Sequence, residues 1–172
     1  MENRATIKVG NYGKRRLRVV DSRSKGQRAE YQVRDLLRAQ TEIQWERVPG
    51  SGGFNASHGL KGDLYVPDDA YNIRHCIEVK HYKGDVLNSN LFNVSVSQLE
   101  KFWVQTVREA GEINKEPLLI FKKDRGQWIV ATREEVMAPV ELVLTTEAME
   151  DTIYLYLFSV WLAEQNEETL CK

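Results

Sequence analysis

The sequence is poor in the residues that build disulfide frameworks and zinc sites. Its two cysteines are Cys76, inside an apolar run, and Cys171, next to the last residue. They do not suggest a disulfide framework, and no Cys or His spacing resembles a zinc site. The histidines at 58, 75 and 81 are scattered, and we interpret them as solvated or core side chains. A reducing, cytoplasmic setting fits this composition.

A segment long enough to cross a membrane is also missing. The apolar run IYLYLFSVWLA covers 11 residues, whereas a spanning helix needs about 20. The first residues are polar and lack the apolar core of an export signal, so we expect an intracellular protein with no membrane partner. The 172 residues, 42% of them hydrophobic and 28% charged, suffice for one domain with a core.

The net charge of −1 hides a strong asymmetry. The first 28 residues contain only two acids, Glu2 and Asp21. The same stretch is rich in bases, namely Arg4, Lys8, Lys14, Arg15, Arg16, Arg18, Arg23, Lys25 and Arg28. A basic arm on a nearly neutral protein indicates contact with nucleic acid, although a solubilising tail would have the same composition.

Hydrophobic spacing predicts helices that flank a mixed sheet, which is an α/β sandwich. Ser24 is a plausible N-cap for the first helix, and Gly111 a plausible stop for the second. The expected helices cover residues 24–40 and 95–111, and the expected strands cover 43–48, 63–66, 73–80, 117–123 and 127–133. Residues 49–62 are rich in Gly, Ser and Asn and are expected to form a loop.

The C-terminal part is predicted less clearly. Residues 134–145 are ambiguous, and residues 146–168 are predicted as a last helix that is apolar almost all round. Such a helix must be buried, either at a subunit interface or against its own domain. The expected organisation is an arm at 1–24 and a single domain at 25–172, with a core at 25–135 and a helical extension at about 146–168.

The stretch CIEVKHYKGD, residues 76–85, sets charges into a buried strand. Successive strand side chains point to opposite faces, so Glu78 and Lys80 share one face while Ile77 and Val79 share the other. Lys and Glu are rarely buried. A solvated ion pair worth about 0–1 kcal/mol is the simplest interpretation of these few residues alone.

Four charged residues together indicate phosphodiester chemistry: Glu30, Asp63, Glu78 and Lys80. Cleaving a phosphodiester requires an activated water, compensation for transition-state charge and help for the leaving oxygen. Carboxylates can hold Mg²⁺, which polarises phosphate and lowers the pKa of bound water. A lysine can orient or deprotonate that water, or stabilise developing charge.

The segments GDLYV and CIEVK resemble the PD-(D/E)xK nuclease superfamily, and more closely its Holliday junction resolvases of archaeal and phage type. KGQRAEYQVRDLL is similar to the first helix of that group, with Glu30 as its acidic residue. ERVPGSGG is similar to the next strand and loop, matched by Arg47 and Ser51, and SQLEKFWVQTVREAG with PLLIFKK is similar to the helix and strand that follow. The resemblance covers residues 25–135. Gly62 stands where a proline is expected, and the loop between Ser51 and Asp63 is long.

The resemblance implies a restriction-endonuclease-like fold and a homodimer that nicks opposed strands of a four-way DNA junction. The implied cofactor is Mg²⁺, which Mn²⁺ can replace, with no further small molecule; a phage-encoded protein acting in the host cell fits. Implied catalytic residues are Glu30, Ser51, Asp63, Glu78, Lys80 and Gln98, with Glu30, Asp63 and Glu78 as metal ligands. Expected DNA contacts are Arg15, Arg16, Arg18, Lys25, Arg47, Ser51, Gly52, Lys61 and Lys83.

Three alternatives remain open from the residues alone. The same catalytic parts serve restriction-like, nicking and repair endonucleases, which substrate preference would distinguish from a resolvase. A non-catalytic DNA-binding module could keep the fold, although it would have no reason to keep Asp63, Glu78 and Lys80 together. A basic-armed structural or interaction protein is the third alternative, for which metal would not matter.

Overall fold

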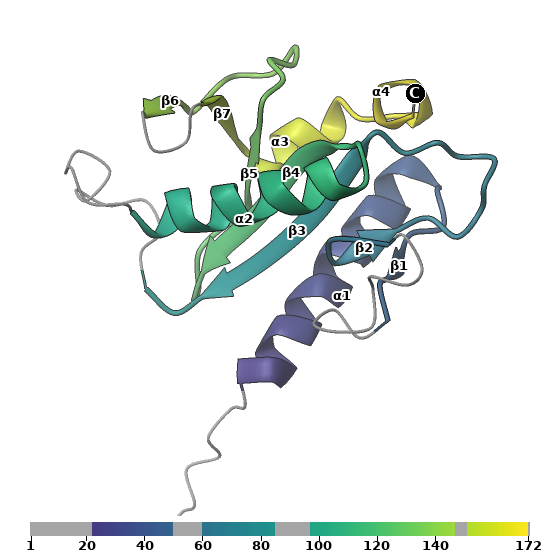
Figure 1. Ribbon diagram of the computed structural model, residues 1–172, viewed down its shortest axis with the longest axis horizontal. Helices are drawn as coiled ribbons and strands as arrows, with labels where there is room; N and C mark the ends of the chain where they lie inside the picture. Colours follow the sequence, from purple (N-terminus) through teal and green to yellow (C-terminus); the bar gives the residue numbers. More distant parts are fainter. Residues whose placement is uncertain (1–21, 50–59, 85–96, 147–150, 172) are drawn as a thin grey trace, which may run out of the picture.

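The computed structural model describes residues 22–49, 60–84, 97–146 and 151–171 (Figure 1). The helices are α1 (Ser22–Thr41), α2 (Gln98–Glu112), α3 (Phe158–Ala163) and α4 (Glu167–Leu170). The strands are β1 (Glu46–Arg47), β2 (Leu64–Tyr65), β3 (His75–Tyr82), β4 (Glu116–Lys123), β5 (Ile129–Thr132), β6 (Leu142–Thr146) and β7 (Asp151–Leu157). No helix within these ranges is long and apolar enough to cross a membrane.

The strands form one seven-stranded mixed sheet in the order β1-β2-β3-β4-β5-β7-β6. The central strands β3 and β4 are parallel, with Glu78 opposite Leu119 and Lys80 opposite Phe121, and the other paired strands are antiparallel. Figure 1 shows β1 and β2 at one edge of the sheet and β6 at the other. The predicted α/β fold with helices around a mixed sheet is confirmed.

Strand alternation divides the core into two layers. Ile77 and Val79 of β3 belong to the larger layer, which α1 and α3 cover. Leu119 and Phe121 of β4 belong to the other layer, which α2 covers with Leu99 and Trp103. The charged face of β3 therefore lies on the side that α2 covers, where Glu78 is buried and Lys80 stays partly exposed. This burial argues against a merely solvated ion pair.

The helix ends differ from the sequence predictions. α1 begins at Ser22, so Ser24 lies inside the helix and is not its N-cap. Gly111 does not stop α2, which continues to Glu112. The N-terminus of α2 has a capping box, in which Ser97 accepts from the Glu100 backbone N–H and the Glu100 side chain accepts from the Ser97 backbone N–H. This cap fixes where the helix starts over the sheet.

The predicted last helix at 146–168 is wrong. Residues 151–157 form β7, which lies between β5 and β6, and only 158–163 and 167–170 are helical. Ile153 and Leu155 pack in the layer under α2, while Tyr154 and Tyr156 pack in the layer under α1. Both faces of β7 are covered, so its sequence is apolar without alternation.

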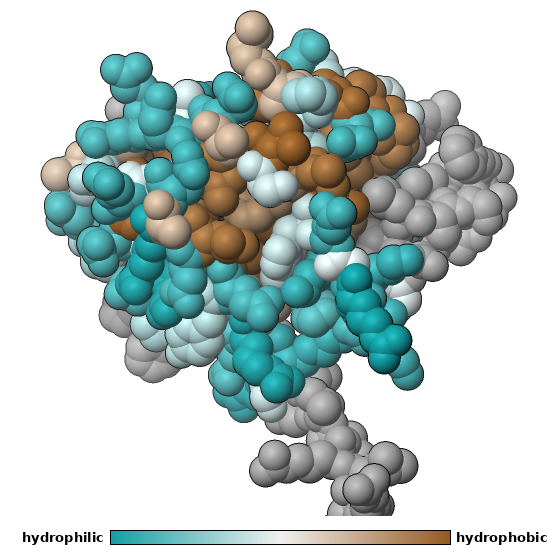
Figure 2. Space-filling model, turned by 180° about the vertical axis from the view of Figure 1, so that it is seen from behind, coloured by the Kyte–Doolittle hydropathy of each residue, from teal (hydrophilic) through white to brown (hydrophobic). Residues whose placement is uncertain are grey.

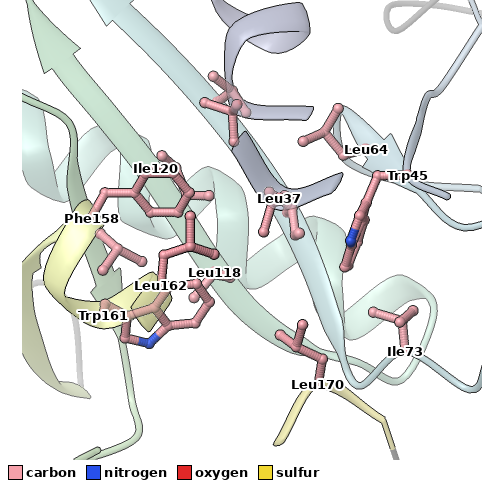
Figure 3. Close-up of a cluster of buried hydrophobic side chains, with 14 of the residues drawn as sticks. Leu37, Trp45, Leu64, Ile73, Leu118, Ile120, Phe158, Trp161, Leu162 and Leu170 are labelled. Atoms are coloured by element: carbon pink, nitrogen blue, oxygen red, sulfur yellow. The ribbon is translucent and has the colours of Figure 1, made fainter. Parts of the chain in front are cut away.

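This arrangement also removes a predicted interface. Phe158 and Trp161 are only 1% and 2% exposed, inside the core of their own chain. Figure 3 shows them beside Leu118 and Ile120 of β4. A subunit contact through these two side chains is therefore ruled out, and the apolar segment 153–163 completes the domain instead.

Candidate active site

The first carboxylate of the site, Asp63, is fixed by the backbone around it. Its backbone N–H donates to the carbonyl of Ile77 over 2.7 Å, and its Oδ2 accepts from the backbone N–H of Val79 over 2.8 Å. Gly62 precedes it with a φ of 76°, and a Cβ there would lie 2.5 Å from the Ile77 oxygen. Only glycine fits this close approach of β2 to β3.

The second carboxylate, Glu78, lies close enough to Asp63 for the two charges to repel. Asp63 is 8% exposed and Glu78 is 4% exposed. Burial raises the pKa of Asp63 well above its usual value, and the charges of Glu78 and then Glu30 raise it further. Burial also raises the pKa of Glu78, against the attraction of Lys80. A pair of buried, mutually repelling carboxylates is a donor set that a divalent cation would neutralise.

The lysine of the constellation, Lys80, forms an ion pair with Glu78. Its Nζ also lies 5.8 Å from the centre of the Phe102 ring on α2. The side chain is 24% exposed, so its amine can still meet a substrate at the surface. The predicted pairing of Glu78 and Lys80 on one face of β3 is thus present, with its open side toward solvent.

A glutamine that sequence reasoning missed completes this group. Gln105 of α2 donates its Nε2 to Glu78 Oε1 over 3.1 Å and to Glu109 Oε1 over 2.9 Å. The predicted glutamine, Gln98, is the first residue of the same helix. Seven residues are nearly two full turns, so both glutamines lie on one face of α2, separated by about 10 Å along the axis. The helical periodicity predicted the face of α2 that carries the glutamine, but not the turn of the helix on which it lies.

The third predicted ligand, Glu30, forms an ion pair with an arginine side chain. It is 8% exposed and forms an ion pair with Arg47, whose Cζ lies 5.0 Å from the centre of the Tyr31 ring. Within the described residues, no three His, Cys, Asp or Glu side chains are grouped as a metal site would require. The structure therefore brings Asp63 and Glu78 together as oxygen donors that suit Mg²⁺, and Glu30 as a ligand stays a prediction.

The predicted DNA contacts are dispersed. Lys61 pairs with Glu112 at 2.5 Å, Lys25 pairs with Asp124, and Lys83 is exposed just beyond β3. Arg47 is the one described member that lies beside the carboxylates, through Glu30. The remaining predictions lie outside the described residues, namely Arg15, Arg16, Arg18, Ser51 and Gly52.

Comparison with known proteins identifies the family of the chain. The family described as "Phage putative PDDEXK endonuclease" matches residues 21–158, which include all four predicted charged residues. The chain belongs to this phage PD-(D/E)xK endonuclease family. The resemblance seen in the sequence is confirmed at the level of a phage-type PD-(D/E)xK nuclease, and the catalytic roles of Asp63, Glu78 and Lys80 stay predictions.

Two further proteins are similar to this member of the family. Protein D14 of Escherichia phage T5 is 51% identical over 160 residues, which cover 89% of this chain and 99% of that protein. The solved structure of Hjc, a Holliday junction resolvase from the archaeal hyperthermophile Archaeoglobus fulgidus, covers 80% of this chain and 87% of its own. Its sequence identity is 22% and the TM-score is 0.38. A likeness of that degree does not bear on the substrate.

Proposed function

We propose that the chain is a Mg²⁺-dependent endonuclease that hydrolyses phosphodiester bonds in DNA. The observation that carries this proposal is the buried Asp63–Glu78 pair with Lys80 bound to Glu78, in a member of a nuclease family. Asp63 and Glu78 would hold the metal ion, which supplies polarisation of the phosphate and a water of lowered pKa. Mn²⁺ has the same preference for oxygen ligands and would replace Mg²⁺.

Each protein group then has a definite task. Lys80 is placed to orient the attacking water and to stabilise negative charge that develops on the phosphate oxygens. Gln105 holds Glu78 from the α2 side, with Glu109 as its second acceptor. Water adds to phosphorus, the bond to the leaving sugar oxygen breaks, and that oxygen takes a proton. Rigid strands hold these groups more precisely than a loop would.

The finer proposal is that the substrate is branched DNA and that the product is a resolved four-way junction. Its support is the ordered resemblance of residues 25–135 to resolvases of archaeal and phage type. Recombination and repair are the processes that produce such junctions. Since the relative of 51% identity is a phage protein, we place this activity inside an infected host cell.

A junction has two-fold symmetry, so paired nicks require two chains related by a two-fold axis. We therefore propose a homodimer. A groove of about 460 Å³ between α1 and α3 could receive the second copy; its lining includes Leu36, Ala39, Trp128 and Leu162. Leu36 is 42% exposed, and Figure 2 shows apolar surface across this face of the molecule. The two-fold symmetry of the substrate is what selects a second copy as its occupant.

The deciding experiment is incubation with a labelled immobile four-way junction and a matched linear duplex, with and without Mg²⁺. We expect paired, metal-dependent nicks in the junction. Asp63→Asn and Glu78→Gln should abolish cutting, while the exposed controls Asp69→Asn and Glu135→Gln should cut like the parent. Full activity in both site variants would refute the assignment.

The substrate series separates the proposals. Equal cutting of linear duplex would replace junction resolution with another endonuclease activity. Tight DNA binding by the parent with no cutting in Mg²⁺ or Mn²⁺ would instead identify a non-catalytic binding module.

A further inference from the structure

Three basic side chains gather at the carboxyl ends of β3 and β4, on the face opposite Lys80. Lys25 of α1 forms an ion pair with Asp124, and His81 Nε2 of β3 lies 2.9 Å from the same Oδ1 atom. Lys122 of β4 donates to Gln32 Oε1 over 3.2 Å. We call Lys25, His81 and Lys122 the basic cluster. Asp124 is the acid that its members share.

The basic cluster is held together against electrostatic repulsion. The side chains of Lys25 and His81 are only 22% and 17% exposed. Burial lowers the pKa of Lys122, and the charge of Lys25 lowers it further despite Asp124. Burial, Lys25 and Lys122 likewise lower the pKa of His81. Lys25 and Lys122 carry two positive charges against the single negative charge of Asp124, so the cluster keeps a net positive charge that an anionic partner can neutralise.

The shape of the cluster is fixed by its neighbours. Lys122 Nζ lies 4.5 Å from the centre of the Trp128 ring, a cation–π contact that restrains the amine. The last residue of β4, Lys123, is exposed, as are Arg125 in the turn that follows and Lys83 just beyond β3. The positive surface thus extends around the ends of both central strands.

Its position relates it to the active site and to the arm. His81 follows Lys80 directly along β3, so the basic cluster begins one residue beyond Lys80, on the other face of the strand. α1, which carries Lys25, begins at Ser22, and the sequence before it includes the run KRRLR at residues 14–18. A bound polyanion that passed the site could therefore continue over the strand ends toward the arm.

We propose that the basic cluster binds the phosphodiester backbone of the DNA that flanks the cleaved bond. The inference rests on the proposed nuclease function and assigns a surface to its substrate. Lys122 and Lys25 contact phosphates, whereas Trp128 and Gln32 hold Lys122 in place. Because such contacts go to the backbone, they strengthen binding of every DNA sequence alike.

The test measures the salt dependence of DNA binding in a Glu78→Gln background, which prevents cutting. Affinity for a labelled duplex and a labelled four-way junction is titrated between 50 and 200 mM salt for Lys122→Gln, Arg125→Gln and the control Lys115→Gln. Lys115 precedes the first residue of β4, so the control removes the same charge from the other end of the strand that carries Lys122. Thermal unfolding confirms that each variant is folded.

We expect Lys122→Gln to reduce the log–log salt slope by about 0.9, so that it loses about 3.5-fold less affinity than the parent over this fourfold rise in salt. Lys115→Gln should keep the parental slope. If Lys122→Gln and Arg125→Gln also keep it while the parent cuts DNA, the inference is overturned and the proposed function stands. If the parent neither binds nor cuts either DNA, the proposed function fails and the inference fails with it.

Discussion

Asp63 is a carboxyl group whose environment opposes its own charge. It is buried, it faces Glu78, and one backbone N–H compensates it. Burying an ionised carboxylate beside another one lowers the stability of the folded protein. This loss of stability can be measured, because protonation of Asp63 or binding of a metal ion would each remove the unfavourable charge.

The first prediction concerns the stability of the metal-free protein. The raised pKa means that the folded state holds the Asp63 proton more tightly than the unfolded state does. Stability therefore falls as pH rises from the ordinary carboxyl value through the raised one. Asp63→Asn cannot ionise, so it should unfold at a higher temperature than the parent at pH 8 and lose this advantage near pH 4.

Thermal unfolding without metal checks this, and each ~1 kcal/mol should appear as about 2–4 °C for a chain of this size. Mg²⁺ should then raise the melting temperature of the parent and leave that of Asp63→Asn unchanged, since only a state that binds the ion is stabilised by it. Asp69→Asn, at an exposed turn, is the control. An equal Mg²⁺ response in parent and Asp63→Asn would show that the ion binds elsewhere.

The second prediction compares the two glutamines of α2. Gln105→Leu removes a hydrogen bond to the Glu78 carboxylate, and bonds to charged groups are worth about 1.5–3 kcal/mol. We expect its kcat to fall about 10- to 100-fold with little change in KM if Gln105 acts by positioning the Glu78 carboxylate. Gln98→Leu tests the residue chosen from the sequence alone. A larger loss in Gln98→Leu would return the positioning role to that residue.

At this scale the sequence predicted three of the residues that the structure brings together in the candidate site. Glu78 and Lys80 were predicted because charges on an apolar strand stand out, and Asp63 because GDLYV followed by CIEVK resembles a nuclease motif. Gln105 was not, because an amide on the mixed face of a helix has no such contrast. Its contact with Glu78 depends on where α2 crosses β3, which only the tertiary packing decides.

Among the helices and strands, the sequence predicted the central elements well and the C-terminal strand wrongly. β3, β4, β5 and α2 were placed within a few residues of their observed bounds, since each has a clear period or length. Residues 151–157 were predicted as helix but form β7. A strand buried on both faces shows no alternation, so its apolar run looks like that of a buried helix. The β-branched and aromatic residues of IYLYL were the available signal for a strand.

The third prediction tests the corrected role of the C-terminal segment. Trp161→Ala should lower the free energy of unfolding by about 3–5 kcal/mol, the usual cost of emptying a buried aromatic site. Ser159→Ala, at an exposed position of the same helix, should change it by less than about 0.5 kcal/mol. Denaturant titration measures both. A folded Trp161→Ala monomer of parental stability would contradict the assignment of this side chain to the core.

At the scale of the whole molecule, the fourth prediction concerns the proposed homodimer. Leu36→Glu places a charge at the groove between α1 and α3, and should convert a dimer into a folded monomer in sedimentation experiments. The monomer should nick a junction singly where the parent makes paired nicks. Val104→Glu is the matched control, because Val104 is 48% exposed on the opposite layer of the fold. A parent that sediments as a monomer, or a Leu36→Glu dimer, would remove this groove from the proposal.

The order of the strands has a consequence for how the protein is made. The ribosome delivers Glu30, Asp63 and Glu78 within the first half of the chain, yet α1 packs in one core layer with Phe158, Trp161 and Leu162. A nascent chain can therefore close that layer only after nearly all of it has been synthesised. Synthesis arrested before β7 should leave a polypeptide that contains the three acids but not the framework that aligns them. Nuclease activity would thus appear at the end of translation, and an incomplete copy would pose little danger to the nucleic acid around it.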